Sequence, residues 1–302
     1  MKHPLLFFAV LLSGLAFHAN AVAPPPLILA TLFPVVDFAR EVAGEYADVA
    51  AVLPPGAEAH SFSPTSADIM RLSRADAFLY VSDNMETWVP RLLATAPPGM
   101  LITALAPTSE EPEGQEEEGT PHAHSHAQDP HVWLDPLQAM EMVERIANTL
   151  SAVAPDHAAV YDANASALRN RLLELHQEIE TALADCPQRT LMVGGHFAFG
   201  HFANRYGLTH ISPYPGFAPN AQPSPRALAQ LVKTMRENNT HALFYEEILD
   251  PKLARVLAQE TGAFLLPLHS LHNLTTAEVA EAPSYFTLMR RNLENLKKGL
   301  CP

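Results

Sequence analysis

The fold is decided by the stretch Leu27-Ile28-Leu29-Ala30-Thr31-Leu32, which ends at Phe33-Pro34. This run is short, apolar and rich in residues that favour strands, so it predicts a buried strand, and residues 35–43 follow it with the pattern of a helix. The alternation continues with strands expected at 49–53, 77–81 and 101–103 and helices at 66–75 and 86–94. Strands that alternate with helices in this way indicate a parallel sheet with helices on both faces.

The same alternation resumes after Cys186-Pro187. Strands are expected at 190–193, 208–211, 242–245 and 264–268, and helices at 199–206, 225–238, 251–261 and 285–298. Between the halves, residues 136–184 are helix-rich, and Pro155 marks the start of a second helix of about 28 residues, or roughly 40 Å. We therefore expect an α/β protein with an N-terminal lobe at 22–155 and a C-terminal lobe at 186–302, joined by a linking helix at 156–185.

The first 21 residues have the features of a signal peptide. Lys2 and His3 precede an apolar run at 5–17, and Ala19-Asn20-Ala21 forms a small-x-small cleavage site. The run is shorter than the about 20 apolar residues that span a bilayer. We expect cleavage after about Ala21 and export to the periplasm, and the absence of a cysteine after the run argues against a lipid anchor.

The composition is that of a globular protein, with 48% hydrophobic and 17% charged residues. The formal net charge of −14 argues against a nucleic-acid partner, because phosphate binding requires clustered Lys and Arg. There are only two cysteines, Cys186 and Cys301. An oxidising compartment would let them pair, the alternative being two free thiols, and their spacing does not suit a two-cysteine metal motif.

Four histidines lie at or near the ends of predicted strands, where ligands collect in parallel α/β folds. Two come from each half, so they could converge in the cleft between the lobes, and neutral imidazole is a natural zinc ligand. A single histidine is more often a surface residue, and the chain has 15 of them. The role of His272, three residues beyond the last of the four, is left open. The four are His60, His131, His196 and His269.

Three segments resemble the ligand motifs of the metal-binding cluster of ABC-transporter solute-binding proteins. They are Leu53-Pro54-Pro55-Gly56-Ala57-Glu58-Ala59-His60, His131-Val132-Trp133-Leu134-Asp135-Pro136 and Gly195-His196-Phe197-Ala198-Phe199-Gly200-His201. Phe244-Tyr245-Glu246-Glu247 is similar to the family's Phe-x-Glu strand end, and the match extends from about residue 27 to the C-terminus. Within this family the chain is most similar to zinc-uptake members of the ZnuA type, since their third ligand is usually histidine, as His196 is here.

The resemblance implies a monomeric periplasmic protein that binds Zn²⁺, docks on an inner-membrane ABC permease and performs no chemistry. His60, His131 and His196 are the implied ligands. The chain departs from the family at the fourth position, where an aspartate usually stands and this sequence has His269. We expect His269 to take the place of that aspartate, the alternatives being water or a carboxylate such as Glu58.

Two further acidic residues, Asp135 and Glu246, could orient ligand imidazoles by accepting the N–H that faces away from the metal. The alternative roles are a helix N-cap for Asp135 and a solvated strand end for Glu246.

Residues 107–129 interrupt the α/β pattern with Glu, Gly, Pro and His and almost no apolar side chains. Such a composition cannot bury enough surface to order the chain, so it predicts a disordered loop. An acidic, histidine-bearing loop before the second motif is also a feature of zinc carriers. The loop could capture zinc weakly through His122, His124 and His126, or it could be a solvated linker.

Other functions compete with zinc transport. The same fold could carry Mn²⁺ or Fe²⁺. A zinc hydrolase would need an open metal position and a general base, for which Glu58 or Glu246 could be imagined, but no HExxH-type helix is present. A surface adhesin is a third alternative, which the missing lipid-anchor cysteine makes less attractive.

Overall fold

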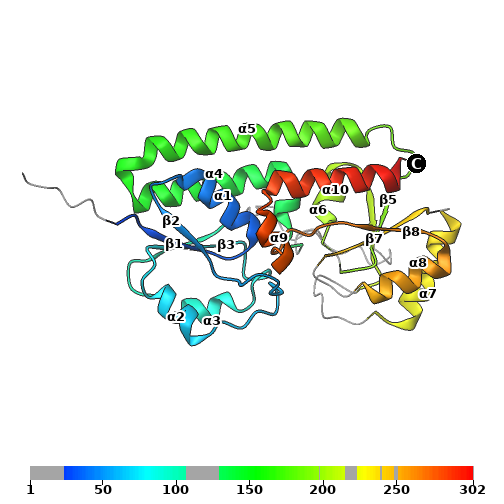
Figure 1. The fold of residues 1–302 in the computed structure, drawn as a ribbon, viewed down its shortest axis with the longest axis horizontal. Coiled ribbons are helices and arrows are strands. Elements are labelled where there is room, and N and C mark those ends of the chain that lie inside the picture. Colours follow the sequence, from blue (N-terminus) through cyan, green and yellow to red (C-terminus); the bar gives the residue numbers. More distant parts are fainter. Residues whose placement is uncertain are drawn as a thin grey trace, which may run out of the picture.

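A four-stranded parallel sheet and two parallel strand pairs lie along one long helix in the computed structural model (Figure 1). The structure describes residues 24–106, 129–196, 198–214, 223–238, 240–247 and 251–301. The predicted signal peptide and the loop histidines His122, His124 and His126 lie outside these ranges. The expected α/β architecture with two lobes and a spine helix is confirmed.

The N-terminal sheet has the strand order β2-β1-β3-β4, and all its neighbours are parallel. Ile28 of β1 lies opposite Val49 of β2 and Ala77 of β3. From β1 the chain goes first to β2 on one side and then to β3 on the other side of β1. In parallel α/β sheets, ligands bind at the carboxyl ends of the strands beside such a reversal of the strand order. The strands are β1 (Leu27–Ala30), β2 (Asp48–Ala51), β3 (Ala77–Tyr80) and β4 (Leu101–Ala104).

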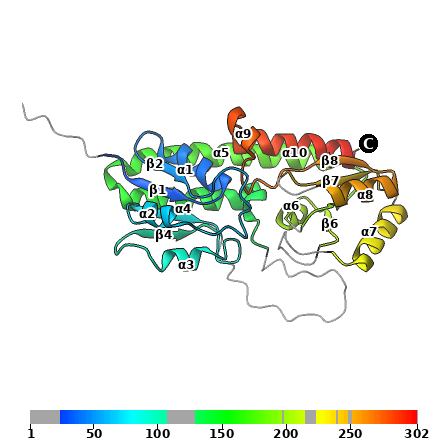
Figure 2. The ribbon, with the colours of Figure 1, turned by 60° about the horizontal axis from the view of Figure 1, so that its bottom comes forward.

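Helices cover both faces of this sheet (Figure 2). On one face lie α1 (Phe33–Ala43) and α4 (Pro136–Val153), and on the other lie α2 (Ser66–Leu72) and α3 (Val89–Leu93). Local chemistry fixes where they begin. Thr65 and Asp68 form a capping box at α2, and Pro34 occupies the first turn of α1, where no backbone N–H is needed.

The spine helix α5 (Ala158–Leu183) has 26 residues and is roughly 39 Å long. It follows the short helix η3 (Pro155–His157), so Pro155 divides the two long helices as predicted. One end of α5 packs against α1 and α4 and the other against α10 (Tyr285–Leu300). An apolar stripe along one side of α5 is buried and consists of Tyr161, Ala165, Leu168, Leu172, Leu175, Ile179 and Leu183.

The C-terminal half contains two parallel strand pairs, β5–β6 and β7–β8, joined by a bridge between Val193 and Phe244. The strands are β5 (Thr190–Met192), β6 (Thr209–Ile211), β7 (Ala242–Tyr245) and β8 (Phe264–Pro267). The helices that accompany them are α6 (Gly200–Arg205), α7 (Pro225–Glu237) and α8 (Lys252–Thr261). Cys186 and Cys301 form a disulfide, which confirms the predicted pairing.

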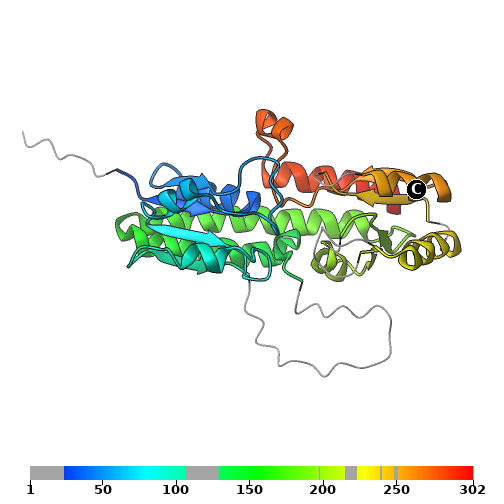
Figure 3. The ribbon, with the colours of Figure 1, turned by 90° about the horizontal axis from the view of Figure 1, so that it is seen from below.

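One helix was not predicted. The six-residue helix α9 (Thr276–Glu281) stands away from the body of the molecule in Figure 3 and has no buried residue. The segment between β8 and α9 runs from the C-terminal half to the N-terminal half. There Phe33 donates its N–H to the carbonyl of His272, and the Asn273 amide donates to the carbonyls of Pro54 and Ala57.

A single large hydrophobic core takes residues from both halves. Phe38 and Phe78 from the N-terminal half, Trp133 beside them, and Phe244 and Tyr285 from the C-terminal half all belong to it and are fully buried. A second, smaller core lies between the C-terminal sheet and the helices α7 and α8. The shared core fixes the two sheets relative to each other, because separating them would expose its apolar surface to water.

Candidate metal centre

Four imidazoles converge where the two halves meet, and they come from four separate segments. His60 lies in the loop between β2 and α2, and His131 precedes the short helix η2 (Val132–Leu134) ahead of α4. His196 follows β5, and His272 lies in the segment after β8. One ring nitrogen from each of these four residues lies within 4.8 Å of the others.

Two of the distances between these nitrogens match those around a tetrahedral metal ion. The Nε2 atom of His131 lies 3.4 Å from Nε2 of His60 and 3.4 Å from Nε2 of His196. A zinc ion with Zn–N bonds of about 2.0–2.1 Å requires about 3.3–3.4 Å between neighbouring ligand nitrogens in a tetrahedron. The Nε2 atom of His272 is buried without a hydrogen-bond partner, which is costly in a protein interior unless a cation takes it up.

Each ring is oriented by a contact to its outer side. His131 Nδ1 lies 2.7 Å from a carboxylate oxygen of Asp129, and His196 Nδ1 lies 2.8 Å from one of Glu246. His272 Nδ1 lies 2.8 Å from the hydroxyl of Ser270, and the backbone of Met85 hydrogen-bonds the His60 ring. A proton held at Nδ1 of His131, His196 and His272 leaves the lone pair of Nε2 directed at the centre of the cluster.

Burial keeps most of these rings neutral. It is the largest cause that lowers the pKa of His60 to about 4, and burial also holds the pKa values of His131 and His272 well below the usual range. His196 differs: burial disfavours its charged form, but the attraction and hydrogen bond of Glu246 outweigh that and raise its pKa. Three of the four candidate ligands therefore need not lose a proton to bind a metal near neutral pH.

The pH dependence of zinc binding should accordingly be governed by His196. As the pH falls, a second proton on this raised-pKa imidazole occupies Nε2 and competes with the metal. We expect Glu246→Gln to shift the decline in affinity to lower pH, and to weaken binding at the alkaline end by about 10–100-fold because the ring loses its orienting carboxylate. Chelator competition across the range in which histidines titrate measures both effects. The exposed Glu237→Gln on α7 is the control, and an unshifted decline in Glu246→Gln would contradict the assignment.

The structure supports the orienting role predicted for Glu246, and Gly195 makes it possible. A Cβ at Gly195 would overlap the carboxylate oxygen of Glu246 that contacts His196. The bridge from Val193 to Phe244 brings the ends of β5 and β7 together, so that His196 and Glu246 meet directly after their strands.

The orienting role predicted for Asp135 is wrong, and Asp129 fills it instead. Asp135 caps α4 by accepting the Leu137 N–H at 3.0 Å, and both its oxygens accept from Arg205. Asp129 stands two residues before His131, close enough to accept both the backbone N–H and the ring contact of that histidine. The Asp-Pro-His order was therefore the sequence signal for this contact.

Glu58 shapes the loop of His60 rather than completing the cluster. Its carboxylate accepts the backbone N–H groups of His60 and Ser61 at 2.9 and 2.8 Å. His201 bridges Gln138 and the carbonyl of Asp129, so it supports the segment that orients His131.

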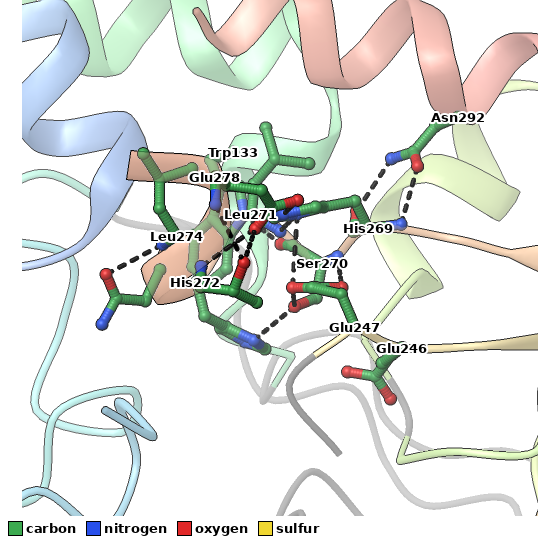
Figure 4. Close-up of polar contacts among 12 residues, drawn as sticks. Trp133, Glu246, Glu247, His269, Ser270, Leu271, His272, Leu274, Glu278 and Asn292 are labelled. Atoms are coloured by element: carbon green, nitrogen blue, oxygen red, sulfur yellow. Dashed lines mark hydrogen bonds and ion pairs between the residues drawn. The ribbon is translucent and has the colours of Figure 1, made fainter. Parts of the chain in front are cut away.

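The fourth position requires a correction, since among the described residues His272 and not His269 joins the other three. His269 lies between two glutamates, with Nδ1 3.2 Å from Glu247 and Nε2 3.2 Å from Glu278 (Figure 4). Leu271 has a φ of 61°, which turns the chain through the left-handed region. Because of this turn, the side chain of His272 reaches the cluster. A Ser-Leu-His sequence does not predict such a turn, since leucine rarely adopts a positive φ.

Two halves built on parallel strands, with an imidazole cluster where they meet, define a metal-binding protein of the two-lobed α/β class. None of the helices in the described ranges is long and apolar enough to cross a membrane.

Comparisons with known proteins give the particular family. The family described as zinc-uptake complex component A, periplasmic, matches residues 28–299. Zinc-binding protein AdcA of Streptococcus pyogenes serotype M3 is 35% identical over 289 residues, which cover 89% of this chain and 55% of AdcA. The high-affinity zinc uptake system protein ZnuA of Bacillus subtilis is 32% identical over 279 residues, covering 90% of this chain and 87% of ZnuA. The crystal structure of the Zn(II)-bound ZnuA-like domain of Streptococcus pneumoniae AdcA is similar with a TM-score of 0.76 at 30% identity, covering 92% and 100% of the two chains.

The chain thus belongs to the family of periplasmic zinc-uptake component A, as the resemblance of its motifs predicted. This is a family of extracytoplasmic solute-binding proteins that serve transport and are not enzymes. The chain spans about half the length, 55%, of the AdcA relatives it matches.

Proposed function

We propose that this protein binds one Zn²⁺ through the Nε2 atoms of His60, His131, His196 and His272 and delivers it to an ABC permease. The observation that carries the proposal is the cluster of four imidazoles, with ligand nitrogens within 4.8 Å and three of the rings buried. The zinc named for AdcA and ZnuA, and for the Zn(II)-bound domain, supports the same cargo.

The donor set favours zinc over the alternatives. Mn²⁺ prefers oxygen ligands, whereas four imidazole nitrogens suit Zn²⁺ and the metals near it in the affinity order. A cluster with four protein ligands also leaves no open position for a catalytic water, which argues against the hydrolase alternative.

Delivery follows from the place of the site. The ligands come from loops of both halves, so a permease that displaces any one of these loops would loosen the metal. Protonation of the imidazoles would assist release, since only neutral rings bind the ion. Export past the inner membrane, by the signal peptide expected at residues 1–21, belongs to the same proposal, and the Cys186–Cys301 disulfide suits an oxidising compartment.

Metal content and competition test the cargo. Protein purified without chelator and exposed to equimolar Zn²⁺, Mn²⁺ and Fe²⁺ is expected to retain zinc in a 1:1 ratio, and a hundredfold excess of Mn²⁺, about 2.7 kcal/mol of mass action, should fail to displace it. Preferential retention of Mn²⁺ or Fe²⁺ would overturn the zinc assignment. For delivery, cells that lack the protein should regain growth in zinc-poor medium with the wild type and not with His131→Ala. Equal rescue by both would contradict it.

A further inference from the structure

The segment that carries His272 is held along its length by hydrogen bonds to other parts of the chain, among them Asn292 and Trp133 (Figure 4). Asn292 of α10 clamps the backbone of His269, accepting its N–H at 2.7 Å and donating to its carbonyl at 2.8 Å. The indole of Trp133, two residues after the ligand His131, donates to the carbonyl of Ser270 at 2.9 Å. The left-handed backbone conformation of Leu271 is strained for a residue with a side chain, and these hydrogen bonds on both sides of Leu271 can maintain it.

The hydroxyl of Ser270 stands between His272 and the carboxylate of Glu247, which follows β7. The Ser270 Oγ atom lies 2.8 Å from His272 Nδ1 and 2.9 Å from Glu247 Oε1. The other oxygen of Glu247 accepts the backbone N–H of Ser270 at 3.0 Å. His131 and His196 contact their carboxylates directly, so the arrangement at His272 differs from theirs.

The direction of these hydrogen bonds follows from the number of protons. A hydroxyl has one proton to donate, and an ionised carboxylate only accepts. Burial raises the pKa of Glu247, and at a pH above that pKa the Ser270 O–H donates to Glu247 while its lone pair accepts the Nδ1–H of His272. The Nε2 atom of His272 is then unprotonated, and this is the atom that lies buried without a hydrogen-bond partner.

We propose that Glu247 and Ser270 are positioning residues that set the tautomer of the fourth ligand, so that His272 always presents an unprotonated Nε2 to the metal. The proposal rests on the proposed function in one respect, namely that His272 binds zinc. We call the hydrogen-bonded chain from Glu247 through Ser270 to His272 the relay. Without the relay, the Nε2–H tautomer of His272 becomes accessible, and each zinc ion must first drive the ring back to the Nδ1–H form.

His269 lies beside the Glu247–Ser270 pair without donating to it. Its Nδ1 atom lies 3.2 Å from the same Glu247 oxygen that accepts from Ser270, and its Nε2 atom lies 3.2 Å from Glu278. Glu278 in turn caps α9 through Thr275, and its contact with His269 is the largest cause that lowers its pKa to about 2. The Nδ1 atom of His269 accepts the backbone N–H of Leu271 at 2.9 Å, so His269 stabilises the left-handed turn that brings His272 into the cluster.

Two substitutions test the relay. Ser270→Ala removes the hydroxyl, and Glu247→Gln replaces an acceptor of two hydrogen bonds by an amide whose single oxygen can accept only one of them. Each variant is expected to raise the zinc Kd by about 10–100-fold. Each should also convert the metal-free His272 ring from the Nδ1–H form to a mixture of tautomers. The exposed Ser73→Ala at the end of α2 is the control and should change neither quantity.

Long-range ¹H–¹⁵N spectra of the metal-free protein report the tautomer, with the His272 signals assigned by their loss in His272→Gln. A role in folding alone would lower the melting temperature and leave the tautomer unchanged. A Nδ1–H ring in both folded variants, with a Kd within threefold of wild type, overturns the proposal. If the wild type itself fails to bind zinc, the proposed function falls, whereas the tautomer measurement on the metal-free protein still decides the relay.

Discussion

Replacing His272 with alanine is expected to weaken zinc binding by about a hundred- to a thousandfold, whereas His269→Ala should cost less than about tenfold. Zinc sites with four protein ligands bind with about 10–16 kcal/mol, so one ligand corresponds to roughly 3–4 kcal/mol. His272 belongs to the cluster, and its Nε2 atom has no hydrogen-bond partner there. His269 lies outside the cluster, because its Nδ1 atom accepts the Leu271 N–H and its Nε2 atom lies 3.2 Å from Glu278.

The pair of variants is well matched, because both residues are buried histidines of the same segment. Chelator competition gives the two affinities, and X-ray absorption at the zinc edge counts the nitrogen ligands. We expect His272→Ala to lose one nitrogen and His269→Ala to keep four. The reverse pattern would restore His269 as the fourth ligand, as the sequence first indicated.

Removal of the disulfide is expected to lower the free energy of unfolding by about 2–5 kcal/mol. Cys186 and Cys301 are separated by 115 residues, and an open chain of that length gains much conformational entropy when it unfolds. The bond anchors the end of α10, the helix whose Asn292 clamps His269. The loss should therefore affect the fold of the C-terminal half more than the zinc ligands themselves.

Urea unfolding of the metal-free protein measures this effect in the double variant Cys186→Ser/Cys301→Ser. Wild-type protein treated with a reductant serves as the matched sample, and its midpoint should fall to that of the variant. An oxidised wild type that unfolds at the same urea concentration as the variant would show that the disulfide contributes nothing to stability.

The sequence predicted the strands and long helices well, because their apolar residues repeat with the period of buried elements. The stripe from Tyr161 to Leu183 on α5 is the clearest case. The helix α9 was not predicted, because it has no repeating pattern of apolar residues. None of its six residues is buried, so it lacks an apolar period, and it is fixed instead by the capping box of Thr275 and Glu278.

Some residues of the site could likewise be predicted from the sequence, and others could not. His60, His131 and His196 follow from the rule that ligands gather at strand ends, and the structure brings these three residues together. His272 and Asp129 depend on backbone geometry beyond that rule. The left-handed Leu271 moves the fourth imidazole three residues along the chain, and a hydrogen-bonded turn places Asp129 against His131.

The amide of Asn273 has a mechanical consequence for unloading. This amide donates hydrogen bonds to the carbonyls of Pro54 and Ala57, in the loop that carries His60, and Asn273 directly follows His272 in the chain. The segments that carry His60 and His272, which are 212 positions apart in sequence, are thereby linked by hydrogen bonds. We therefore expect a partner that displaces either segment to move both imidazoles together, while the shared core behind them stays packed.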